Sequence, residues 1–176
     1  RDFLLAAPSG EFVEVAKDLR ELVNCDDILN RVVPGAFAQF NNEHYTIVEM
    51  EGKRLILTPY NAVPDTLDEY YDPVNGQTHT VNHFTRQVVE SRPTPSSLPK
   101  DVEAQRVALQ QALREYVAEH YPTGAGVVFA DEKRHCFVVV ISSALNSAQN
   151  YMTGSWRSTW EFPYPSGNSV TLAGRI

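Results

Sequence analysis

The stretch Gly154-Ser155-Trp156-Arg157-Ser158-Thr159-Trp160-Glu161-Phe162 decides the fold of this 176-residue chain, because both of its tryptophans lie there. The aromatic residues alternate with polar ones in a period of two, which is typical of a β-strand. We therefore predict a strand with an aromatic face, carried by mostly buried Trp156 and Trp160, and a polar face that includes Arg157. Large aromatic side chains bury much apolar surface, so this strand should anchor a sheet.

The residues on either side of this strand predict an antiparallel meander over residues 123–176. Its strands are expected at 126–130, 135–143, 153–162 and 169–176, joined by short polar turns. The second strand is apolar on both faces and should be covered on both sides. The last edge of the sheet would remain open, which calls for a partner or for more chain. Both ends of the sequence, Arg1 and Ile176, are expected to lie inside a longer protein.

Residues 1–41 have helical periodicity and predict a helical stalk. Apolar residues recur at helical spacing in the second predicted helix, at Phe12, Val15, Leu19, Leu22 and Val23. Ser9 and Asp26 are candidate N-caps of the second and third helices. Pro34 with Gly35 should kink or split the third helix. The short turns favour an antiparallel three-helix bundle.

Between the stalk and the meander the sequence predicts hairpins and one helix. Residues 42–92 form a β-hairpin segment, with one hairpin at 45–58 and a looser one at 70–89. Residues 93–122 comprise a proline-rich linker and a helix that starts at Lys100 and ends near Tyr121. The fold class is therefore α+β.

Composition excludes several classes of protein. With 43% hydrophobic residues the chain is globular, and a net charge of −7 argues against a non-specific nucleic-acid binder. The longest apolar run, 136–141, is far shorter than the roughly 20 residues of a membrane-spanning helix. The two cysteines, Cys25 and Cys136, suit free thiols in a reducing compartment.

No pattern of catalytic or metal-binding residues stands out. His79 and His83 have metal-like spacing, but in a strand they would lie about 13 Å apart, so a surface hairpin is predicted instead. Gly124-Ala125-Gly126 lacks the third glycine and the helix of a dinucleotide loop. Cys136 should be a buried filler. A solvated loop is predicted for the acidic cluster Asp65, Asp68, Glu69 and Asp72, because the spacing of a calcium loop is absent.

Four segments resemble the alpha subunit of F-actin capping protein (CapZ), in the right order along the chain. Residues 150–160 resemble its N-x-x-x-G-x-W-R-S-x-W stretch, and residues 113–121 resemble its L-R-x-Y-V-x-x-H-Y helix. Residues 36–41 match its A-F-A-Q-Y-N helix end with Phe40 in place of tyrosine. Residues 7–12 resemble the segment that opens its second helix.

This resemblance implies a binding protein without a cofactor, not an enzyme. Alpha subunits of the family pair with a beta subunit of similar fold and share one continuous sheet with it. The heterodimer binds the fast-growing, barbed end of an actin filament and blocks subunit exchange, so a location in the cytoplasm on the cytoskeleton is implied. A homodimer is the less favoured alternative.

The resemblance also limits which residues can be assigned. In the family, actin contacts come from basic residues near the C-terminus and from a terminal tentacle, both beyond Ile176, so no actin-contact residue is assigned. Trp156, Arg157, Ser158 and Trp160 are candidates for the core or the subunit interface. For Arg157 a buried pairing or subunit contact is favoured over direct actin contact, because it lies in mid-sheet.

A second hypothesis is a structural role. The same fold could cap an actin-related filament inside a dynactin-like assembly. A basic amphipathic tail beyond the present chain would favour actin capping.

Overall fold

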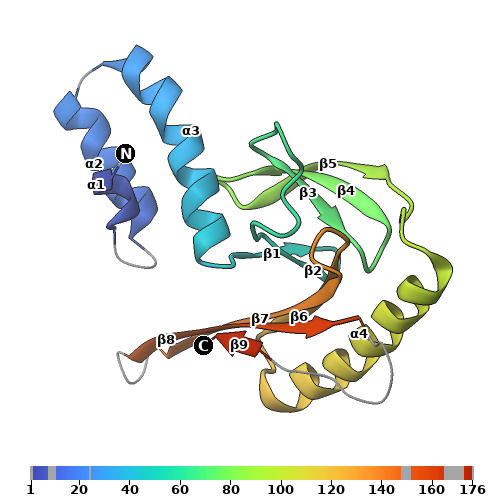
Figure 1. Cartoon of the computed structure of the whole chain (residues 1–176). Helices are drawn as coiled ribbons and strands as arrows, with labels where there is room; N and C mark the ends of the chain where they lie inside the picture. The colour runs from blue at the N-terminus through green and yellow to red at the C-terminus, as the bar shows by residue number, and fades with distance from the viewer. Residues whose placement is uncertain (1, 8–10, 24, 148–151, 165–172, 176) are drawn as a thin grey trace.

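The computed structural model describes residues 2–7, 11–23, 25–147, 152–164 and 173–175. Three helices, α1 (Asp2–Leu5), α2 (Phe12–Val23) and α3 (Asp26–Glu43), form a group that projects from the strands (Figure 1). Phe12 is buried at its centre, edge-on to Phe37 with ring centroids 4.5 Å apart and tilted against Phe40 at 4.2 Å. These contacts hold α2 against α3.

The third helix differs from its prediction at two points. It continues through Pro34, so the helix does not split there, and the alternative of a kink stays a prediction. Proline costs a helix interior about 3 kcal/mol, and burial of Phe37 and Phe40 one turn later offsets that cost. Its N-cap is Cys25, without a side-chain cap, so Asp26 begins the helix instead of capping it. The other candidate cap, Ser9, lies outside the described residues.

The predicted hairpin at 45–58 is confirmed. Strands β1 (Ile47–Met50) and β2 (Lys53–Ile56) pair antiparallel. The two residues of the turn, Glu51 and Gly52, have φ of 36° and 81°. Positive φ at both central positions matches the right-handed twist of paired strands, which is why glycine is suited to the second position.

The second predicted hairpin is wrong in its strand count. It is a three-stranded sheet of β3 (Glu69–Asp72), β4 (Gln77–Asn82) and β5 (Gln87–Pro93) in the order β3-β4-β5. The chain reverses after Asn82, whose Oδ1 accepts the N–H groups of Phe84 and Thr85 at 3.0 Å each. The side chain of Asn82 therefore stabilises this turn, and no glycine or proline marks it in the sequence.

The C-terminal half follows the prediction closely. Helix α4 (Lys100–His120) precedes a four-stranded antiparallel sheet in the order β6-β7-β8-β9, made of β6 (Ala125–Asp131), β7 (Cys136–Ser147), β8 (Met152–Pro163) and β9 (Ala173–Arg175). Figure 1 shows α4 along one face of this sheet and the β1–β2 hairpin above the other.

Strand β7 is covered on both faces, as its composition predicts. Phe137, Val139 and Ile141 point towards α4 and pack with Leu113 and Val117. On the other face Cys136, Val138 and Val140 pack with Ile56. A further cluster joins the β1–β2 hairpin to the three-stranded sheet, and its buried members are Val48, Leu55, Leu57, Tyr70 and Val81. The hairpin is therefore a layer between two sheets.

A buried histidine joins the helices to the three-stranded sheet. His83 follows β4, and its Nδ1 lies 3.0 Å from Nδ2 of Asn41 at the end of α3. Its Nε2 lies 2.9 Å from the carbonyl oxygen of Leu67. A neutral ring that donates from Nε2 and accepts at Nδ1 satisfies both contacts. Burial lowers the pKa of His83, against the opposing effects of the Leu67 hydrogen bond and of Asp68.

This lowered pKa predicts a loss of stability in mild acid. Below about pH 6.5 the imidazole of His83 becomes protonated in the unfolded chain, whereas its burial opposes protonation in the folded protein. The free energy of unfolding should therefore fall from pH 7 towards pH 5, by about 1.4 kcal/mol for each unit of pKa depression. Urea unfolding of His83→Gln should show a flatter pH dependence than the parent. Equal slopes in the parent and the variant would contradict the assignment.

Candidate functional site: the tryptophan strand and the sheet around it

The aromatic face of β8 points towards α4. Trp160 pairs in register with Val139 and packs into the cluster beneath α4. Ser158, two residues earlier, is buried at 3% exposure. Trp156 lies on the same face beyond the cover of the helix, and its ring stacks on Tyr121 with centroids 6.3 Å apart. At 38% exposure Trp156 is less buried than predicted.

The polar face of β8 binds the segment where α3 meets β1. Arg157 is exposed, so the predicted burial is wrong, whereas its predicted role in a subunit contact stays a prediction. Its Nη1 donates to the carbonyl oxygen of Glu43 at the end of α3. The hydroxyl groups of Thr159 and Tyr45 lie 2.8 Å apart. These contacts hold the helical group against the four-stranded sheet of the same chain. The sequence does not indicate the partner of Arg157, because that partner is a main-chain oxygen 114 residues away.

Two polar side chains close the β6 edge of the sheet. Gln110 of α4 donates through Nε2 to the carbonyl oxygen of Gly126 at 3.1 Å and accepts the N–H of Val128 through Oε1 at 2.8 Å. Arg54 of β2 donates to the carbonyl oxygen of Gly124 at 2.7 Å. An amide that donates and accepts in this way replaces a neighbouring strand, so this edge offers fewer free groups for pairing. Sequence reasoning missed both residues.

The opposite edge of the sheet differs from this closed one. Strand β9 pairs with β8 through three residues, Trp160 opposite Gly174 among them, and has no further strand beside it within the described residues. Near this side of the molecule an exposed aromatic row runs from the end of α4 to β8. Its members are Tyr116, His120, Tyr121 and Trp156. An open strand edge next to exposed aromatic rings is the character of a protein-binding surface.

The two tryptophans should respond differently to truncation. Trp160→Ala should cost about 2–4 kcal/mol of unfolding free energy, somewhat below the cost of a fully buried tryptophan. Trp156→Ala should cost less than about 1.5 kcal/mol, because it loses mainly one stacking contact. Chemical denaturation of both variants measures the difference. Equal losses would mean that Trp156 is as much a core residue as Trp160.

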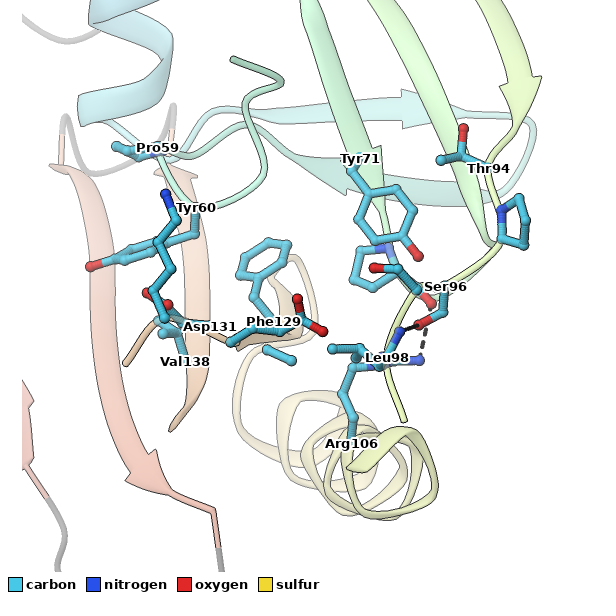
Figure 2. Close-up of a pocket in the computed structure, with 16 residues that line it drawn as sticks. Pro59, Tyr60, Tyr71, Thr94, Ser96, Leu98, Arg106, Phe129, Asp131 and Val138 are labelled. Atoms are coloured by element: carbon cyan, nitrogen blue, oxygen red, sulfur yellow. Dashed lines mark hydrogen bonds between the residues drawn. The ribbon is translucent and has the colours of Figure 1, made fainter. Parts of the chain in front are cut away.

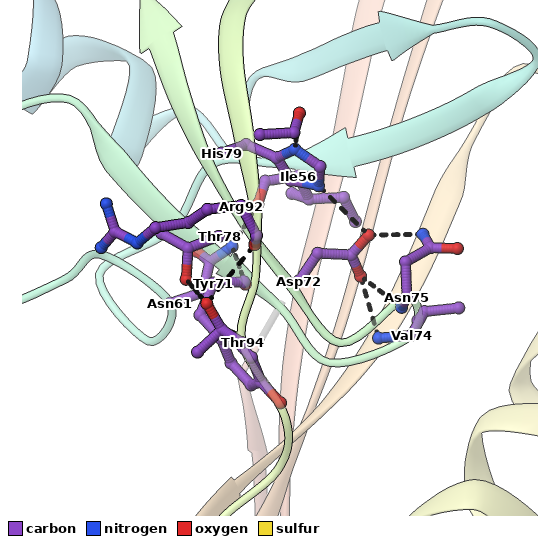
Figure 3. Close-up of polar contacts among 11 residues, drawn as sticks. Ile56, Asn61, Tyr71, Asp72, Val74, Asn75, Thr78, His79, Arg92 and Thr94 are labelled. Carbon is purple, nitrogen blue, oxygen red and sulfur yellow. Dashed lines mark hydrogen bonds and ion pairs between the residues drawn. The ribbon is translucent and has the colours of Figure 1, made fainter.

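His79 and His83 are buried, so the predicted surface hairpin is wrong for both. Of the acidic cluster only Asp72 is buried, with the contacts drawn in Figure 3, whereas Asp65 and Asp68 are exposed, as a solvated loop predicts. Asp72 is 5% exposed; Oδ1 accepts the N–H groups of Val74 and Asn75, and Oδ2 accepts from the Asn75 amide. His79 is 3% exposed, with Nδ1 2.8 Å from the Ser91 hydroxyl and Nε2 3.7 Å from Asp72. His79 meets the third strand directly, because it pairs in register with Ser91 of β5.

Serine, histidine and aspartate meet here without the arrangement of a catalytic triad. Ser91 lies within strand β5, where no strained turn presents its hydroxyl group, and the 3.7 Å gap exceeds a hydrogen bond. Asp72 serves as a turn cap, since its carboxylate accepts three hydrogen bonds from residues 74 and 75. The contacts therefore support the sheet and supply no nucleophile.

The remaining candidates form no cofactor or metal site. Within the described ranges, no three His, Cys, Asp or Glu side chains are grouped so that they could hold a metal ion. Cys136 is buried, and burial raises the pKa of its thiol, as expected for a filler. No helix among the described residues has the length and apolar character needed to cross a membrane.

Fold and surface define a class of protein: a mixed α and β protein with a projecting helical group and an antiparallel sheet whose outer edge, as far as the structure describes it, has no further strand. The sequence pattern of the F-actin capping protein alpha subunit matches residues 1–176. The chain belongs to that family.

Curated relatives carry the same description. The F-actin-capping protein subunit alpha of Caenorhabditis elegans is 34% identical over 180 residues, covering 99% of this chain and 62% of the relative. The F-actin-capping protein subunit alpha of Arabidopsis thaliana is 31% identical, and the match covers 96% of this chain and 58% of that relative. The chain thus spans about six tenths of the length of these relatives.

A solved structure supports the fold. The structure described as the homodimeric actin capping protein alpha subunit from Plasmodium berghei aligns with a TM-score of 0.79 at 22% identity. The alignment covers 96% of this chain and 64% of that one. At this identity the likeness shows the fold alone.

Proposed function

We propose that this chain is the larger part of an alpha subunit that caps the barbed end of actin filaments. The observation that carries the proposal is the match to the family along residues 1–176. The relatives are named for filament capping, which favours that activity over a static structural role. Binding suffices for it, so no catalytic group is needed, and the place of action is the cytoplasmic cytoskeleton.

We further propose that the subunit works as a dimer. The outer edge of β9 leaves main-chain groups that a second subunit could pair with, and the aromatic row around Trp156 offers apolar area beside it. A beta subunit of similar fold is the preferred partner. A second copy of the chain is the other candidate, because the Plasmodium berghei relative is described as homodimeric.

Filament disassembly tests the capping proposal. Labelled filaments are diluted below the critical concentration with and without the full-length protein, expressed alone and together with a beta subunit. Capping predicts that subunit loss from barbed ends stops at nanomolar protein, whereas loss from pointed ends continues. Unchanged loss from barbed ends with both preparations would refute it.

Light scattering of the same preparations separates the two kinds of dimer. A heterodimer predicts that the chain is recovered in a complex of one alpha and one beta subunit. Trp156→Ala should weaken that complex more than it lowers stability, since Trp156 is 38% exposed and its ring contact within the chain is the stacking on Tyr121. A stable monomer at micromolar concentration would exclude both forms of dimer.

A further inference from the structure

A cavity of about 530 Å³ lies away from the open edge of β9, between α4 and the β6–β7 turn. Figure 2 shows its walls: Tyr60 from the loop after β2, Tyr71 from β3, residues 94–98 before α4, and Phe129 from β6. Neither the predicted dimer edge nor any contact described above uses it. Its volume lies within the range of small-ligand and peptide sites.

Aromatic and proline rings line much of the cavity, together with Leu98, Ala130 and Val138. The rings of Tyr60 and Phe129 are nearly parallel, 24° apart in plane with centroids separated by 6.4 Å. Tyr60 is 39% exposed although it faces the cavity, so a bound chain could cover it. In the view of Figure 2, Phe129 lies between Tyr60 and Tyr71. Three prolines, Pro59, Pro73 and Pro95, complete this surface.

One wall carries a buried hydrogen-bond donor without a partner. Arg106 is 3% exposed and lines the cavity. Its Nε and Nη2 donate to the Glu103 carboxylate at 2.9 and 2.7 Å, and Nη2 also donates to the Pro73 carbonyl oxygen at 3.0 Å. Nη1 has no hydrogen-bond partner in the described structure. A buried donor left unpaired costs about 1–3 kcal/mol, so an acceptor from a ligand would be stabilising there.

The charges around the cavity select a neutral acceptor over an anion. The hydrogen bond from Arg106 keeps the pKa of Glu103 below its ordinary value, so the carboxylate stays ionised and neutralises the guanidinium. At the rim, Asp131 is paired with Arg134, whereas Glu132 and Lys133, which also line the cavity, make no ion pair with any residue the structure describes. A carbonyl oxygen suits the interior, and a positive charge suits Glu132.

We propose that this cavity is a docking site for a proline-rich peptide segment of a partner protein, with a basic residue beside its prolines. A polyproline II chain is extended and already ordered, and it exposes main-chain carbonyl oxygens between ring faces. Aromatic-lined grooves bind such chains through ring contacts and a few donors. Here Tyr60 and Phe129 would contact the prolines, Arg106 would donate to a carbonyl group, and Glu132 would pair with the basic residue.

Fluorescence polarisation tests the proposal on the full-length protein in its native assembly, without actin. The probes are labelled hexaproline peptides preceded by arginine or by glutamate, and a glycine-serine peptide preceded by arginine. The arginine-hexaproline probe should bind best and saturably. Tyr60→Ala should weaken its binding at least about tenfold, and Glu132→Ala should remove the preference for arginine over glutamate.

Two further variants make the result decisive. Tyr71→Phe keeps the aromatic ring but removes the hydroxyl group, whose hydrogen bond to Ser96 holds the segment before α4 beside the cavity, and it should weaken binding severalfold. Phe84→Ala truncates an exposed aromatic residue that is not in this cavity and should bind like the parent. The proposal is overturned if no probe binds at millimolar concentration, if Tyr60→Ala and Phe84→Ala behave alike, or if the glycine-serine probe or inorganic phosphate competes equally well.

Discussion

Replacement of Phe12 by alanine is expected to destabilise the protein by about 3–5 kcal/mol, the usual cost of truncating a buried phenylalanine. Phe12 is 1% exposed and touches both Phe37 and Phe40, so its loss leaves a cavity between α2 and α3. Few other contacts hold these helices together. The helices should therefore lose their packing against each other before the sheets unfold. Denaturant unfolding gives the loss, and limited proteolysis should show new cleavage within residues 11–43.

The matched control for this substitution is Phe3→Ala. Phe3 is 66% exposed on α1, and surface substitutions usually stay within about 0.5 kcal/mol. The same chemical change is thus made inside and outside the aromatic cluster. A loss below about 1 kcal/mol for Phe12→Ala would show that the cluster does not hold the helices.

Replacement of Gln110 by leucine is the second large effect, with an expected cost of about 2–5 kcal/mol. The substitution keeps the size of the side chain but leaves the carbonyl oxygen of Gly126 and the N–H of Val128 without their partner. Each unpaired main-chain group at a buried edge costs about 1–3 kcal/mol. Hydrogen exchange at Val128 should accelerate, because its N–H would no longer be protected.

Gln111→Leu is the control on the same helix. Gln111 is exposed and its amide hydrogen-bonds only Glu115 among the contacts described. It should change stability by less than about 0.5 kcal/mol. If the two leucine variants are equally stable, water replaces the amide and Gln110 does not close the edge.

The sequence allowed the sheet to be predicted well because its signal is local. Alternation around Trp160 and the apolar run of β7 defined the order β6-β7-β8-β9, and the 3.6-residue period defined α4. The reversal after Asn82 was missed because an asparagine side chain, not glycine or proline, makes that turn. The additional strand places Ser91 beside His79, a contact that a two-stranded hairpin would not supply.

The polar residues of the candidate sites were less predictable, because their partners are distant main-chain groups. Arg106 and Gln110 sit on the buried stripe of α4 with Leu113 and Val117, at spacings of three, four and seven residues. Two polar residues on an apolar stripe are a signal that they meet buried partners, but the sequence does not say which. Arg157 likewise binds a carbonyl oxygen of α3 that no sequence pattern marks.

The central claim is that this chain belongs to a subunit that caps barbed ends, and single-filament microscopy of actin growth tests it most directly. Filaments with distinguishable ends are watched while full-length protein and a beta subunit are added at nanomolar concentration. The proposed function predicts that the fast-growing end stops abruptly while the slow-growing end continues at its previous rate. Continued growth of the fast end at saturating protein would contradict the account.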